Sequence, residues 1–118
     1  MGGHGTHTTP EAVAVSTYAE TEVGDTHRTA ARTITEADLV NFAGVSGDFN
    51  DLHLDAETMN ESEYGERIAQ GALVFSVMTG LLWQSRSDDD LVAFYGVDRL
   101  RFRGAVFVGD TVHVETEV

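Results

Sequence analysis

An aspartate and a histidine lie five positions apart, at Asp48 and His53, in a segment that reads Gly-Asp-Phe-Asn-Asp-Leu-His. A carboxylate and an imidazole are together sufficient to move a proton and to activate a water molecule. Gly47 and Asn50 flank Asp48 and are residue types that let a chain turn tightly. We therefore expect a loop that presents an acid–base pair, with Asp48 as the principal base, His53 as its partner, and Gly47 and Asn50 as loop support.

Helices are predicted on both sides of this loop. Thr35, followed three residues later by Asp38, is typical of an N-terminal cap, and the first helix is expected over residues 36–44. A second, short helix is expected over residues 56–63, where Asp55 fits the N-cap better than a role behind the active site.

Residues 71–84 are almost all apolar and predict a long helix. A helix that is apolar on every side is expected to be buried on every side, which in a small domain requires a sheet wrapped around it. The stretch is shorter than the roughly 18 residues that a membrane-spanning helix needs.

Much of the remaining chain alternates between apolar and polar residues, the pattern of strands with one buried face. In residues 91–103, apolar side chains are expected on one face and Arg99, Arg101 and Arg103 on the other. We expect a first short strand or a bound arm over residues 15–23, and strands over 28–34, 91–103 and 111–118. Turns are expected at 24–25 and 104–110, and a polar connection over 85–90.

Together these motifs resemble the MaoC-like dehydratases, whose hallmark reads roughly (S)GDxNPxHxD. The resemblance covers about residues 28–118 and points most strongly to the short (R)-specific enoyl-CoA hydratases, also called the hydratase-2 type. It implies an α+β hot-dog fold, with an antiparallel sheet around a long buried central helix, and it implies that the backbone N–H of Gly71 is an oxyanion donor. The matching residues are Gly47, Asp48, Asn50, His53, Asp55, Gly71 and the Phe-Val-Gly-Asp sequence at 107–110.

The chain departs from the family pattern at two positions. Asp51 stands where the family usually has proline, so the loop loses a fixed φ and gains a carboxylate. Gln70 stands where many relatives have histidine. Both departures bear on substrate preference rather than on the acid–base pair itself.

The resemblance implies an enzyme that adds water to trans-2-enoyl-CoA thioesters or removes it from 3-hydroxyacyl-CoA. Such an activity links fatty-acid β-oxidation to polyhydroxyalkanoate monomers. Two alternatives stay open: an acyl-CoA thioesterase on the same fold, and a non-catalytic acyl-CoA-binding module. Thioesterases of this fold typically have a carboxylate on or near the central helix, and residues 71–84 contain no Asp or Glu. The pair Asp48 and His53 disfavours the non-catalytic module, whereas Asp51 leaves it open.

Arg99, Arg101 and Arg103 make up nearly half of the chain's seven basic residues. They are candidates for contacts to the phosphates of coenzyme A, and the alternative is that they pair with surface carboxylates. Coenzyme A is here part of the substrate, and neither a separate cofactor nor a metal is expected.

The charge balance is extreme: 20 acidic residues stand against seven arginines, no lysine is present, and the net charge is −13. A carboxylate-rich surface without lysine is what a protein working in molar salt would have, so we expect a halophilic source. Nucleic acid is not an expected partner, because its phosphates need a cationic surface. The absence of cysteine excludes disulfides and thiolate metal sites. No stretch has the roughly 18 or more apolar residues of a membrane span, and the N-terminus is polar rather than a signal peptide, so a cytoplasmic protein without membrane contact is expected.

The sequence predicts a disordered tail over residues 1–12 and a single hot-dog domain over residues 13–118. His4 and His7 could chelate a metal weakly, but a mobile tail explains them better. A homodimer or higher homo-oligomer is expected, because a single hot-dog sheet leaves an edge strand open. The last predicted strand lacks partners, so the natural protein is expected to continue for about 30 residues past Val118.

Stability should depend strongly on salt. Repulsion among the excess carboxylates weakens the fold in dilute buffer, and ions screen it beyond about 10 Å at 0.1 M salt. We predict that the melting temperature rises markedly between low salt and molar KCl, as measured by thermal denaturation. A flat or falling curve would contradict the halophilic interpretation.

Overall fold

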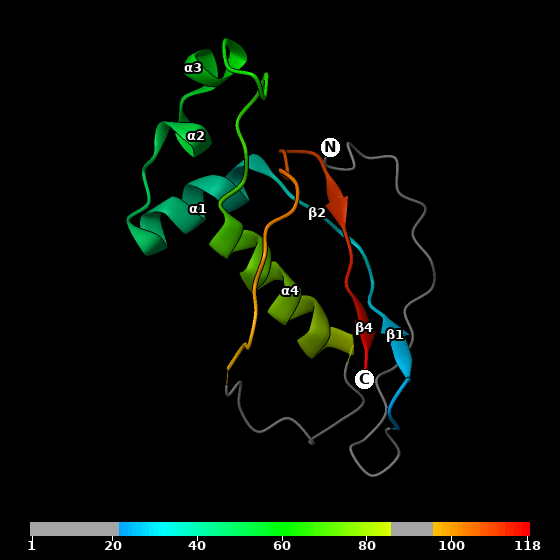
Figure 1. Ribbon diagram of the computed structural model, residues 1–118. Helices are drawn as coiled ribbons and strands as arrows, with labels where there is room; N and C mark the ends of the chain where they lie inside the picture. The colour runs from blue at the N-terminus through cyan, green and yellow to red at the C-terminus, as the bar shows by residue number, and fades with distance from the viewer. Residues whose placement is uncertain (1–21, 86–95) are drawn as a thin grey trace.

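The computed structural model describes residues 22–85 and 96–118 (Figure 1). Helices and short strands are combined within one chain, which agrees with the predicted α+β class. In chain order the elements are β1 (Thr26–Arg28), β2 (Arg32–Thr33), α1 (Glu36–Ser46), α2 (Asp51–Leu54), α3 (Ala56–Asn60), α4 (Gly71–Ser85), β3 (Thr111–Val112) and β4 (Glu115–Glu117).

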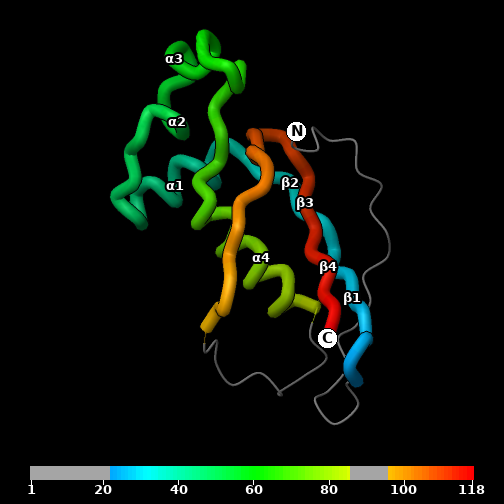
Figure 2. The backbone as a smooth tube through the Cα atoms, viewed as in Figure 1, coloured from blue at the N-terminus to red at the C-terminus, as the bar shows by residue number. Residues whose placement is uncertain are grey.

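The strands form two short antiparallel ladders, β1 with β4 and β2 with β3 (Figure 2). The strands predicted over 28–34 and 111–118 are therefore each shorter and interrupted. The cause lies between the ladders, where the Thr29 N–H donates to the Val114 carbonyl and the Val114 N–H donates to Thr29 Oγ1, both at 2.9 Å. A side-chain oxygen thus replaces a backbone carbonyl and breaks the regular pairing.

Helix α1 begins at the predicted cap. Thr35 Oγ1 accepts from the Asp38 N–H at 3.3 Å, and Asp38 Oδ2 accepts from the Thr35 N–H at 2.8 Å, which completes a capping box. The helix runs two residues past the predicted end, to Ser46. There Gly47 adopts a left-handed conformation (φ 79°) and its N–H bonds the Ala43 carbonyl, as in a glycine C-cap.

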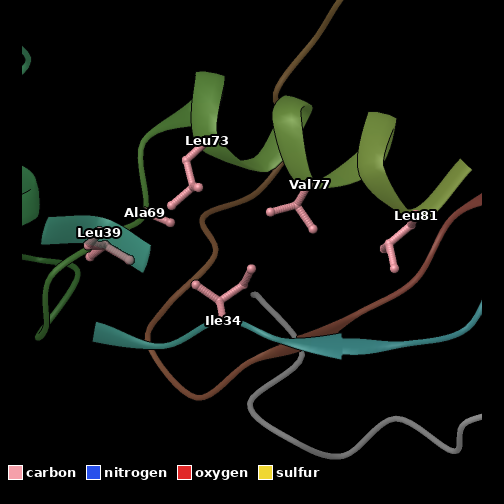
Figure 3. Packing of buried hydrophobic residues seen from close by; sticks show 6 residues of the cluster. All are labelled: Ile34, Leu39, Ala69, Leu73, Val77 and Leu81. Carbon is pink, nitrogen blue, oxygen red and sulfur yellow. The ribbon is translucent and has the colours of Figure 1, made fainter. Parts of the chain in front are cut away.

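The core lies between α4 and the strands (Figure 3). Leu73, Val77 and Leu81, four residues apart, form the buried stripe of α4 and face Ile34. The prediction that α4 is buried on every side is wrong for the described residues, because Trp83 is 58 % exposed and the described strands lie along one side. The buried hydrophobic cluster consists of Ile34, Leu39, Ala69, Leu73, Val77 and Leu81.

The strand predicted over residues 91–103 is not observed where the structure describes it. Residues 91–95 lie outside the described part, and residues 96–103 form no strand and are exposed on both predicted faces. Backbone pairing begins only at Val106, whose carbonyl accepts from the Ala69 N–H at 2.7 Å, and at the bridge between Ile68 and Phe107. The turn predicted over 104–110 is present only in its second half, where Gly109 has φ 95°.

The remaining predictions have mixed outcomes. The turn at 24–25 is present, with Gly24 at φ 98°, and α3 is shorter than the predicted 56–63. The predicted tail (1–12), most of the first strand (15–23) and most of the connection over 85–90 lie outside the described residues. Over the described ranges, no helix combines the length and apolar character needed to cross a membrane.

Candidate active site

Asp48 is held at the turn that follows α1. Ser46 Oγ donates to the Phe42 carbonyl at 2.7 Å and accepts from the Asp48 N–H at 3.1 Å. Asp48 Oδ1 in turn accepts from the Asn50 N–H at 3.3 Å. Ser46 was not among the predicted site residues, although a serine before a helix-ending glycine is a readable signal for such a brace.

His53 lies on a helix, so the prediction that a loop presents it is wrong. Asn50 is the N-cap of α2, and its Oδ1 accepts from the Leu52 N–H at 2.9 Å. A capped turn of helix begins one residue later and places His53, 7 % exposed, on its inner side. Asn50 thus supports the site by starting a helix.

Ile68 orients the imidazole. Its carbonyl is 2.8 Å from His53 Nδ1, and its N–H donates to the Leu52 carbonyl at 2.9 Å. Because a carbonyl only accepts, Nδ1 must hold the hydrogen. The other ring nitrogen, Nε2, is therefore directed toward Asp48, whose Oδ2 lies 3.3 Å away. Sequence reasoning missed Ile68, since it acts through its backbone and is distant along the chain.

The contact between Asp48 and His53 is a hydrogen bond only when a proton lies between the two groups. An ionised carboxylate and the bare Nε2 of a neutral imidazole would both be acceptors, and two acceptors do not attract at 3.3 Å. The ring is buried, whereas the Asp48 side chain is 46 % exposed, so one member of the pair meets solvent. The arrangement can take a proton at one group and deliver one from the other.

The connector that begins at Ile68 leads directly into α4, which starts three residues later at Gly71 (Figure 1). Gln70 Nε2 donates to the Leu39 carbonyl at 3.0 Å, which fastens the start of α4 to α1. The first N–H groups of a helix have no partner within it and favour negative charge.

Among the described residues, no hydrogen bond or ion pair links the three arginines predicted as phosphate ligands to Asp48 or His53. Within residues 22–85 and 96–118, no ion pair links Arg99, Arg101 or Arg103 to a carboxylate, and all three are exposed. The other described arginines are paired: Arg28 with Glu115, Arg32 with Asp38 and Arg67 with Glu36.

Asp55 is a helix cap, as predicted. The Thr58 backbone N–H donates to Asp55 Oδ1 at 2.9 Å and holds the pKa of that carboxyl below its usual value. Among the described residues, no three His, Asp or Glu side chains gather in a group that could hold a metal ion.

Comparison with known proteins identifies the family. A model of the MaoC-like domain matches residues 18–118. The chain belongs to the MaoC-like dehydratase family. It is 37 % identical over 97 residues to an (R)-specific enoyl-CoA hydratase of Aeromonas caviae, a match that spans 82 % of this chain and 70 % of the relative. It is 40 % identical over 97 residues to the protein MaoC of Klebsiella aerogenes, again over 82 % of this chain but only 29 % of that relative.

Solved structures of the family have the same arrangement of elements. The unliganded (R)-hydratase of Pseudomonas aeruginosa superposes with a TM-score of 0.73 at 36 % identity, covering 92 % of this chain and 68 % of that one. The described helices and strands therefore belong to a hot-dog architecture of the (R)-hydratase type.

Asp51, which stands where the family usually has proline, fits the local backbone of this MaoC-like domain. Asp51 is the first residue of α2, the helical position that proline tolerates best. Asn50 before it has φ −59° and ψ 141°, the extended conformation that a following proline requires. The local backbone thus suits either residue.

We predict that Asp51→Pro leaves the free energy of unfolding within about 1 kcal/mol of wild type. The control, Leu52→Pro, removes the N–H that Asn50 caps and should cost more than about 1 kcal/mol. Urea denaturation measures both variants. Equal destabilisation by the two substitutions would show that the described cap of α2 is wrong.

Proposed function

We propose that this protein hydrates trans-2-enoyl-CoA thioesters with (R) stereochemistry, or catalyses the reverse dehydration of 3-hydroxyacyl-CoA. The observation that carries the proposal is the 3.3 Å contact between His53 Nε2 and Asp48 Oδ2, with the ring oriented by the Ile68 carbonyl. Membership of the MaoC-like family and similarity to proteins described as (R)-specific enoyl-CoA hydratases support the reaction class.

The shared proton allows a balanced cycle. Asp48 accepts a proton from water as the water oxygen bonds to C3, and His53 gives its Nε2 proton to C2. Asp48 then holds a proton and His53 lacks one. Transfer across the same 3.3 Å contact restores the starting state. The net change is addition of one water across the double bond, with no external acid or base.

Negative charge develops on the thioester oxygen during this reaction. The Gly71 N–H at the start of α4 is our proposed donor to that oxygen, since helix N-termini stabilise negative charge. We assign the coenzyme A phosphates to Arg99, Arg101 and Arg103, which have no carboxylate partner among the described residues. Coenzyme A enters as part of the substrate, and no other cofactor takes part.

The proposal includes a complete hot-dog sheet around α4 and a homodimer. Leu100 is 51 % exposed, which supports further sheet and a second copy over this side. A thioesterase is disfavoured, because α4 contains no carboxylate, and an acyl-CoA-binding module would have no need for the Asp48–His53 contact.

Removing either member of the pair should abolish most of the activity. We predict that Asp48→Asn and His53→Ala each lower the turnover of crotonyl-CoA at least ~100-fold, because each removes one of the two proton transfers. The assay follows loss of the conjugated enoyl absorbance at high salt. Glu57→Gln, a change at a nearby exposed carboxylate, is the matched control and should keep the wild-type rate.

Two results would end the assignment. One is near wild-type turnover by either variant of the pair. The other is an equal loss of activity in the Glu57→Gln control, because the loss would then not be specific to the pair; melting curves establish that each variant folds.

A further inference from the structure

Phe102 occupies the space beside Gly71 that any larger residue would need. A Cβ atom built on Gly71 would lie 2.9 Å from Phe102 Cζ, 3.0 Å from Cε2 and 3.1 Å from Cε1. All three atoms belong to the outer edge of the ring. The tip of the Phe102 side chain therefore lies against the backbone at the start of α4.

Backbone pairing begins four residues after Phe102 and brings the segment that carries it alongside the start of α4. The Ala69 N–H donates to the Val106 carbonyl, and Ile68 bridges to Phe107, which is completely buried. These contacts hold the segment before Phe107 along the connector that leads into α4 (Figure 2). The same Ile68 accepts from His53 Nδ1. One short stretch of connector thus holds the imidazole, the helix start and the segment that positions Phe102.

Most of the Phe102 ring remains open. The residue is 59 % exposed, although its outer ring edge lies about where a Cβ atom of residue 71 would be. An apolar ring beside a hydrogen-bond donor keeps water away from it, and a donor in a drier surrounding stabilises a developing oxyanion more strongly. An apolar wall at this place also suits the acyl carbons of a thioester better than it suits water.

We infer that Phe102 is a positioning residue of this active site: its ring shields the Gly71 N–H from water and forms an apolar wall against the thioester. The inference rests on the proposed hydratase function and adds a residue that neither the acid–base pair nor the helix start supplies. It also means that a side chain at position 71 would have to displace the Phe102 ring.

Three substitutions at position 102 test the inference. Phe102→Ala removes the wall and should lower kcat for crotonyl-CoA about tenfold, with a change in KM of less than about threefold. Phe102→Leu keeps apolar volume and should recover at least half of the lost rate. Phe102→Tyr adds an oxygen to Cζ, the ring atom nearest Gly71, and should be at least as impaired as Phe102→Ala. Val97→Ala, an exposed apolar residue of the same segment, is the control and should match wild type.

A second measurement does not depend on activity. Gly71→Ala should lower the melting temperature, since its methyl group meets the ring, and adding Phe102→Ala should restore most of that loss. Additive losses in the double variant would overturn the contact. If Phe102→Ala does not fold, the order of the leucine and tyrosine variants decides, and equal rates in those two overturn the inference.

The outcomes separate the two proposals. Wild-type protein that does not hydrate crotonyl-CoA contradicts the proposed function. Active wild-type protein with a Phe102→Ala variant within twofold in kcat contradicts the role of Phe102 and leaves the hydratase assignment intact.

Discussion

The peptide groups of Ile68 hold the candidate site together. The N–H of this residue donates to Leu52 in α2, and its carbonyl accepts from the His53 side chain on the same helix. Both bonds reach a four-residue helix, which is too short to be stable on its own. Without Ile68, neither the position of α2 nor the orientation of the imidazole would be specified, and the contact with Asp48 would lose its geometry.

Three chain segments converge on this connector. α1 ends at Gly47 and presents Asp48, α2 presents His53, and the connector itself continues into Gly71 (Figure 1). Each junction is stabilised locally. A left-handed glycine ends α1, an asparagine caps α2, and the Gln70 side chain bonds the Leu39 carbonyl at the start of α4. Hydrogen bonds between neighbouring chain segments thus hold the acid, the imidazole and the helix start in position.

Local features of this chain were predictable because their causes are local. Thr35 and Asp38 cap α1 through bonds across three residues, and the apolar run from Gly71 forms a helix as its composition predicts. The contact of Asp48 with His53 was also predictable, since the two residues lie only five positions apart. Their catalytic role stays a prediction.

Other features depend on contacts between distant segments, and the sequence pattern could not supply them. The role of Ile68 arises from its backbone, which is the same for every residue type. The break between β1 and β2 depends on a hydroxyl that meets Val114, 85 positions away. Alternation over residues 91–103 predicted a strand, but a strand also needs a neighbour. In the described part of that range no strand forms, and pairing starts only at Val106.

The Ile68 carbonyl fixes the hydrogen on His53 Nδ1 and leaves Nε2 for Asp48. Nitrogen-15 NMR of the histidine side chains tests it most directly, with His53 assigned by comparison with His53→Ala. We predict that the neutral imidazole of His53 holds its hydrogen on Nδ1, where it is donated to the Ile68 carbonyl. A neutral His53 with its only hydrogen on Nε2 would contradict this assignment.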